Sequence, residues 1–116
     1  TGPTSAQDFK NNIMSMVEIA RANGIDVILG NLPPAVASLT WGRPGLEPTT
    51  TIKGLNAWLR DYSAQQRIAY IDYYTALAGP AAGLRSDLGN DGVHPNRKGY
   101  TVMRRLVEEK VSDRRR

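Results

Sequence analysis

Residues 23–34, Asn-Gly-Ile-Asp-Val-Ile-Leu-Gly-Asn-Leu-Pro-Pro, contain the segment that decides the fold. Val27-Ile28-Leu29 at its centre is a short, uniformly apolar run, which is typical of a strand buried on both faces of a parallel sheet. Leu32-Pro33-Pro34 ends this strand, because neither proline can donate a backbone hydrogen bond. Asn23-Gly24 precedes it and predicts a left-handed stop at the end of a helix.

The chain on either side of this strand alternates between helical and extended patterns. A capping pattern at Ser5 and an apolar repeat of three or four residues predict a helix that ends near Ala22. A second helix is predicted near Thr51 to Gln66, a second strand at Ile68 to Tyr73 and a last helix from about Asn96. The expected inner faces are Phe9, Ile13, Met16, Val17 and Ala20 in the first helix, Ile52, Leu55, Leu59 and Tyr62 in the second, and Tyr100, Met103, Leu106, Val107 and Val111 in the last.

The resulting order, helix–strand–helix–strand–helix, predicts an α/β fold in which right-handed crossovers join parallel strands. At 116 residues the chain is the size of one domain. Two parallel strands nevertheless make a poor sheet, since parallel sheets are normally larger and covered on both faces. The edge of the strand at Val27 to Leu29 would leave backbone groups unpaired beside apolar side chains. We therefore expect residues 1–116 to be part of a larger α/β domain.

Composition argues against several classes of function. The chain has no cysteine, so disulfides and thiolate chemistry are excluded and the redox compartment stays open. The net charge of +4 arises mainly after Met103, where six Lys/Arg accompany three Asp/Glu and no aromatic residue is interleaved. A solvated helix face with a basic tail explains this excess better than a nucleic-acid site. The sequence contains no run of about 18 apolar residues that would span a membrane, no metal-ligand cluster and no glycine-rich phosphate loop.

The most specific segment is Asn90-Asp91-Gly92-Val93-His94-Pro95-Asn96. Asp91 and His94 lie three residues apart on a loop before a helix, and His94 is the only histidine in the chain. A loop of this kind can fold the carboxylate back toward the imidazole, so that Asp91 accepts from Nδ1–H and Nε2 is left to act as a general base. The simpler alternative is a turn followed by a helix cap.

The stretch from Asp91 to Tyr100 resembles the final conserved block of the SGNH/GDSL hydrolases, a family of lipases and esterases. The resemblance implies a three-layer α/β/α, flavodoxin-like fold, of which residues 1–116 would be the C-terminal portion with the N-terminal strands missing. It also implies a Ser-His-Asp triad in which Asp91 is the acid and His94 the base. The substrate would be a small-molecule ester, and no metal or organic cofactor is implied.

The nucleophile of that family is not found in this chain. The family takes its serine from a G-D-S segment and an oxyanion donor from a G-x-N-D segment, and neither occurs here. Asn31 is not that donor, because it follows the wrong strand and lacks the aspartate after it. Ser5, Ser15, Ser63 and Ser112 fall on helices, and the loop residues Ser38 and Ser86 lack a nucleophile elbow. The chain alone is therefore predicted to be inactive.

The loop after the first strand is implied to form a wall of the acyl or alcohol pocket. The residues expected to contact substrate are Asn31, Leu32, Pro33, Pro34, Trp41 and Val93. Two alternatives stay open, since Asn31 could be a strand-end turn residue and Trp41 could simply cover the core. Tyr70, Tyr73 and Tyr74 are expected to serve packing, and Asp72 to cap or pair locally.

A second interpretation is a non-catalytic binding or assembly module derived from the same fold. The partner would be the remaining part of the domain in the first case and another copy, paired through the open sheet edge, in the second. The resemblance favours a secreted or periplasmic protein over a cytoplasmic one, and the residues themselves leave both the compartment and the ester open.

Overall fold

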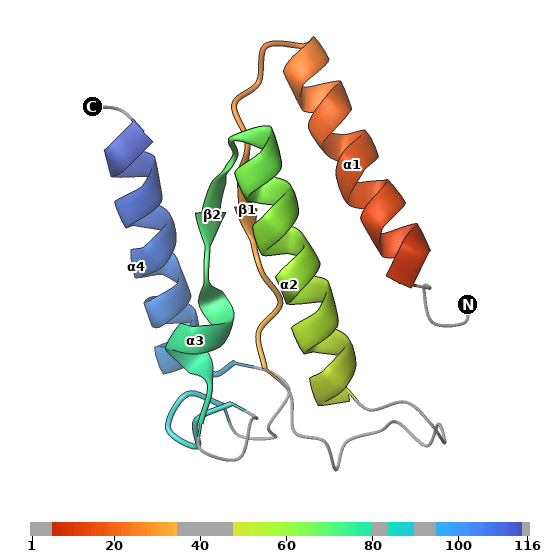
Figure 1. The fold of residues 1–116 in the computed structure, drawn as a ribbon. Coiled ribbons are helices and arrows are strands. Elements are labelled where there is room, and N and C mark those ends of the chain that lie inside the picture. Colours follow the sequence, from red (N-terminus) through yellow and green to blue (C-terminus); the bar gives the residue numbers. More distant parts are fainter. Residues whose placement is uncertain (1–5, 35–47, 80–83, 90–94, 115–116) are drawn as a thin grey trace.

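Two short parallel strands lie at the centre of the protein, with helices on either side (Figure 1). The structure, a computed structural model, describes residues 6–34, 48–79, 84–89 and 95–114. The elements are, in chain order, α1 (Ala6–Ala22), β1 (Ile28–Gly30), α2 (Pro48–Gln66), β2 (Ala69–Ile71), α3 (Tyr73–Leu77) and α4 (Arg97–Arg114). The predicted alternation of helices and strands is confirmed, and the short helix α3 is an addition to it.

The sheet is parallel, as the apolar run around Ile28 predicted. Leu29 pairs with Tyr70 in the middle of the ladder, and Asn31 N donates to Ile71 O at 3.0 Å as its last bond. The second strand is shorter than predicted, because Asp72 already caps the next helix. Within the described ranges β1 pairs with β2 alone, so its other edge is open.

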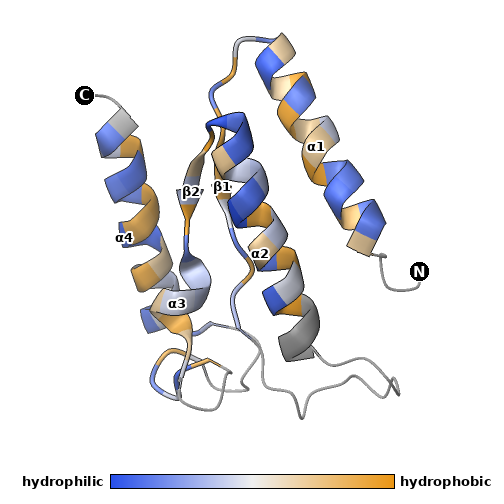
Figure 2. Ribbon diagram, in the orientation of Figure 1, coloured by the Kyte–Doolittle hydropathy of each residue, from blue (hydrophilic) through white to orange (hydrophobic). Residues whose placement is uncertain are grey.

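The helices form a layer on each face of this sheet. α4 lies on one side of the strands, and α2 and α1 lie on the other (Figure 1). Apolar residues form bands along the helices (Figure 2). α2 begins at Pro48, earlier than the predicted Thr51, since a proline costs little in the first turn of a helix. No helix in the described ranges is long and apolar enough to cross a membrane.

The end of α1 confirms one prediction and its inner face corrects another. Gly24 adopts a positive φ of 71°, and Ile25 N donates to Ala20 O at 2.8 Å, as a left-handed helix stop requires. Val17 is buried, but Met16, predicted on the same face, is 58% exposed. The reason is that Val17 takes the centre of the contact and no described element covers the flank of the helix that carries Met16.

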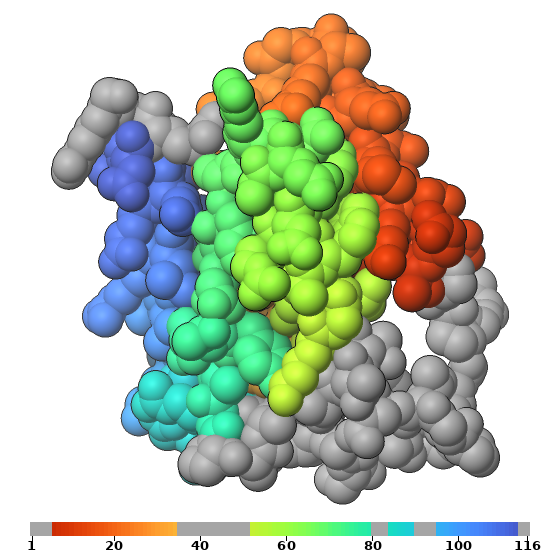
Figure 3. Space-filling model, in the orientation of Figure 1, coloured from red at the N-terminus to blue at the C-terminus, as the bar shows by residue number. Residues whose placement is uncertain are grey.

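α1 and α2 lie side by side (Figure 3), and polar side chains link them. The Arg21 guanidinium donates to Gln66, both to Oε1 at 3.2 Å and to the backbone carbonyl. Lys10 Nζ lies 5.8 Å from the centre of the Trp58 ring, which stacks on Tyr62 with 4.9 Å between centroids. The Arg21 and Lys10 contacts link α1 to α2 beside the buried Val17.

One cluster of the apolar core lies where α3 packs against α4. It consists of Leu77, Leu84 and Leu88, against which Tyr73, Val102 and Met103 pack. Other buried apolar residues among those described are Val17, Leu59, Ile68 and Ile71. Tyr100 and Val107 were predicted on the inner face of α4, but Tyr100 is 57% exposed and Val107 is also exposed. The buried residue at this end of the helix is Gly99, which lets the helix approach Leu88 closely.

Candidate functional site

The predicted acid and base lie between two parts of the chain that the structure fixes. Asp91, Val93 and His94, like Trp41 of the other loop, are outside the described residues. Gly89 and Pro95, which flank the Asp91 to His94 segment, pair with each other in an antiparallel bridge.

Asn96 anchors the end of this segment to the start of α4. Its Oδ1 accepts from Gly99 N at 3.0 Å, as a helix N-cap does. Its backbone N donates to Leu88 O at 2.8 Å, and Nδ2 donates to Asp87 O at 3.1 Å. Gly99 reinforces the arrangement, because a Cβ at this position would lie 2.5 Å from Leu88 O and 2.8 Å from Pro95 Cβ. The two sides of the segment are thus held together by backbone, cap and close packing.

Asn31 ties the carboxyl end of β1 to the corner between β2 and α3. Asn31 is only 6% exposed. Its Nδ2 donates to Tyr70 Oη at 2.7 Å and to Asp72 Oδ1 at 2.8 Å, and its Oδ1 accepts from Tyr74 N at 2.9 Å. The carboxamide is therefore engaged by protein groups on both its nitrogen and its oxygen.

The rest of the predicted wall lies next to Asn31. Leu32 and Pro33 are half-buried, and Pro34 is fully buried. Leu32 N donates to Asn56 Oδ1 at 2.8 Å, and Asn56 Nδ2 donates back to Leu32 O at 2.9 Å. Asn56 was not expected at this site, because a polar residue on a helix face gives no sequence signal for a partner 24 residues away. We call residues 31–34 the strap.

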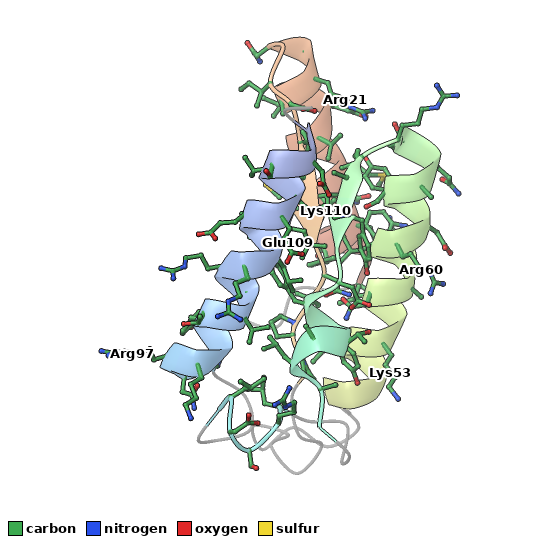
Figure 4. The ribbon with its side chains drawn as sticks, turned by 90° about the vertical axis from the view of Figure 1, so that its left-hand side faces the viewer. Arg21, Lys53, Arg60, Arg97, Glu109 and Lys110 are labelled. Carbon is green, nitrogen blue, oxygen red and sulfur yellow. The ribbon has the colours of Figure 1, made fainter. Side chains whose placement is uncertain are left out.

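A small pocket of about 190 Å³ opens beside the strap, between α2 and the β2–α3 corner. Its lining is Asn31, Lys53, Asn56, Ala57, Arg60, Tyr70, Asp72, Tyr74 and Thr75. Lys53 and Arg60 project from α2 on the side turned away from α4 (Figure 4). Asn31 is the one predicted substrate-contacting residue among the pocket residues that the structure describes.

Asp72 serves as a local cap, as predicted. Thr75 donates to it twice, from N at 3.0 Å and from Oγ1 at 2.6 Å. Burial opposes the charged carboxylate, but the hydrogen bonds from Thr75 and Asn31, with the Arg60 charge, outweigh it and lower the pKa of Asp72. Burial raises the pKa of Tyr70, while the hydrogen bond from Asn31 opposes that rise.

The described serines lie where the sequence places them. Ser15, Ser63 and Ser112 are on helices, and Ser86 is in an exposed turn. Ser63 is almost completely buried inside α2, so its hydroxyl is closed to a substrate. No group of His, Cys, Asp or Glu side chains among the described residues could hold a metal ion.

Known proteins share both the sequence pattern and the fold. A model of the GDSL-like lipase/acylhydrolase family matches residues 1–102. A proposed acylhydrolase from Bacteroides fragilis is 35% identical with a TM-score of 0.82, and the match covers 100% of this chain and 56% of that one. A GDSL-like lipase from Bacteroides thetaiotaomicron is 33% identical with a TM-score of 0.87, covering 97% and 55%.

A more distantly similar structure shares the fold alone. The esterase domain of the ORF1 protein of a zebrafish retrotransposon is 19% identical with a TM-score of 0.72, and the match covers 97% of this chain and 62% of that one. No significant match was found among curated proteins.

The chain spans slightly more than half the length of the two Bacteroides proteins. The match over residues 1–102 and the identity of about one third over the whole chain show that the chain belongs to the GDSL-like lipase/acylhydrolase family.

Proposed function

We propose that this chain supplies the acid and base of an ester hydrolase, with Asp91 as the acid and His94 as the base. The observation that carries the proposal is the pairing of Gly89 with Pro95. It brings the residues that flank the Asp91 to His94 segment next to each other, and this supports contact between a carboxylate and an imidazole three residues apart in the segment between them. The cap at Asn96 and the close approach of Gly99 to Leu88 fix the flanking residues.

The proposed reaction follows from these two side chains. Asp91 accepts a hydrogen bond from His94 Nδ1–H and fixes the tautomer in which Nε2 is free. Nε2 removes the proton of a serine hydroxyl as that oxygen attacks the ester carbonyl, and it returns the proton to the leaving alcohol. Water then attacks the acyl-enzyme with the same histidine as base, which releases the acid and regenerates the serine.

The strap, Trp41 and Val93 form the proposed substrate wall. Leu32 and Pro33 offer apolar, half-buried surface at the carboxyl end of β1, which is the end of an α/β sheet that binds ligands. Trp41 and Val93 would extend this wall. Asn31 contributes by fixing the strap to the β2–α3 corner, since its carboxamide is already bonded to protein groups.

The serine and the oxyanion donors are proposed to come from the remaining part of the domain, so the chain alone would be inactive. The open edge of β1 supports such a partner. Met16, Ile19 and Ile25 leave apolar surface exposed at α1 and the turn after it, and Tyr100 and Val107 do so on α4. A strand added to β1, with helices beside it, would cover surface of this kind.

A non-catalytic binding or assembly module is the second candidate. The same open edge and exposed apolar residues favour it, in a sequence without a G-D-S segment. In this case a second copy would cover the edge. The oligomeric state of the purified chain, measured by light scattering, separates the two, because the module is expected to form a stable dimer.

The catalytic proposal is tested with the complete protein, meaning this chain together with the segment that supplies the serine. His94→Ala is expected to lower the rate of p-nitrophenyl acetate hydrolysis by about 1,000-fold or more, since the serine loses its base. Ser86→Ala, in the neighbouring exposed turn, is the control and should keep the full rate. An undiminished rate in His94→Ala would overturn the role of His94.

A further inference from the structure

We infer that Asn56 is a positioning residue for the substrate wall, acting through Leu32 and without touching the reacting atoms. The inference rests on the proposed esterase function, since it takes the strap as part of the substrate pocket. It concerns a residue on α2, on a different element from the strap and from the Asp91 to His94 segment.

The contact between Asn56 and Leu32 resembles the pair of hydrogen bonds that a residue makes with a neighbouring strand in a sheet. The carboxamide accepts from Leu32 N at 2.8 Å and donates to Leu32 O at 2.9 Å, so a single side chain satisfies both backbone groups of one residue. Asn56 is only 8% exposed, so most of its side chain is enclosed by protein. Bonds of this kind matter most when they are buried, because a lost partner leaves the other group unsatisfied.

Leu32 needs such a partner because of its place in the chain. The bond from Asn31 N to Ile71 O is the last of the sheet ladder. The next two residues are Pro33 and Pro34, neither of which has a backbone N–H to continue the ladder. The Asn56 side chain therefore extends the ladder by one residue, from the helix layer instead of from a neighbouring strand.

Two carboxamides consequently hold the strap from two directions. Asn31 fastens it to the β2–α3 corner, and Asn56 fastens it to α2. Pro34 is fully buried and fixes the far end. Leu32 and Pro33 are the half-buried residues between these fixed points. The position of their side chains in the proposed substrate wall therefore depends on Asn56.

A matched control lies two turns further along the same helix. Ser63 is also buried on α2, but its hydroxyl has no hydrogen-bond partner among the described residues and so forms no hydrogen bond to the strap. Ser63→Ala thus alters a buried polar group of α2 without affecting Leu32. Any effect of Asn56 variants that Ser63→Ala lacks is specific to the strap.

The experiment measures kcat and KM of the complete protein for p-nitrophenyl acetate and p-nitrophenyl hexanoate. Asn56→Leu removes both bonds and is expected to raise KM for the hexanoate about tenfold while kcat changes less than about twofold, because ground-state binding to the wall is lost. Asn56→Asp keeps the acceptor for Leu32 N but loses the donor for Leu32 O, and should give an intermediate KM. The acetate, with little chain to touch the wall, should show a smaller rise.

The inference is overturned if Asn56→Leu and Ser63→Ala give the same KM, or if Asn56→Leu lowers kcat equally for both esters. Amide hydrogen exchange at Leu32 in the same protein tests the positioning step without any turnover. Slow exchange in the wild type and fast exchange in Asn56→Leu are expected, and exchange that is equally slow in both would refute it. A wild type without esterase activity would count against the proposed function, and the exchange result would still decide whether Asn56 holds the strap.

Discussion

Gly99 on α4 offers the sharpest test of how the proposed catalytic segment is held. An alanine here would place Cβ 2.5 Å from Leu88 O and 2.8 Å from Pro95 Cβ, and the first of these contacts is with backbone that cannot rotate away. Helix propensity alone would favour Ala over Gly by about 1 kcal/mol. Overpacking of this kind costs about 1–3 kcal/mol, and displacement of Gly99 N from Asn96 weakens a cap worth about 1 kcal/mol.

The balance predicts that Gly99→Ala lowers the free energy of unfolding by about 2 kcal/mol. Gly54→Ala is the matched control, because Gly54 lies in α2 with nothing within 4 Å of a new Cβ, and it should raise stability by about 0.5–1 kcal/mol. Both values are measured by urea unfolding followed by circular dichroism. Since Pro95 directly follows His94, Gly99→Ala should also slow ester hydrolysis about tenfold or more. A Gly99→Ala protein as stable as Gly54→Ala would refute the close packing of α4 on Leu88.

Two further substitutions probe the frame around the site. Leu77→Ala, at a fully buried core position, is expected to lower the free energy of unfolding by about 3 kcal/mol in urea titrations, and a loss below about 1 kcal/mol would contradict the core under α4. The pKa of Asp72 is lowered in the folded state, so its contribution is present above the unfolded pKa near 3.8 and is lost as the pH falls below it. Asp72→Asn should therefore flatten the loss of stability on acidification below about pH 4, and a variant as acid-sensitive as the wild type would argue against the cap at α3.

The local patterns of the sequence were sufficient for the central layer of the fold. The apolar run around Ile28 and the left-handed stop at Gly24 both depend on neighbours in the chain, and both were predicted correctly. Asp72 could be assigned to a cap because its partner, Thr75, is three residues away. The short helix α3 was missed, since five residues are too few to show a helical repeat.

Long-range contacts were the part that the sequence could not provide. Asn31 reaches Tyr74 across 43 residues, and Asn56 reaches Leu32 across 24, and nothing in either neighbourhood indicates the partner. The apolar periodicity also predicted more buried residues on α1 and α4 than the structure contains. Met16 and Tyr100 fit an apolar stripe, yet the described elements cover only the centre of each stripe.

The central claim is that this chain contributes a base and its orienting acid but not the nucleophile. Labelling of the complete protein with a serine-directed alkyl phosphonate, followed by mass spectrometry of the modified peptide, tests it most directly. A single label on a serine outside residues 1–116, lost in His94→Ala, is the predicted result. A label on any serine within residues 1–116, or labelling that is unchanged in His94→Ala, would contradict the claim.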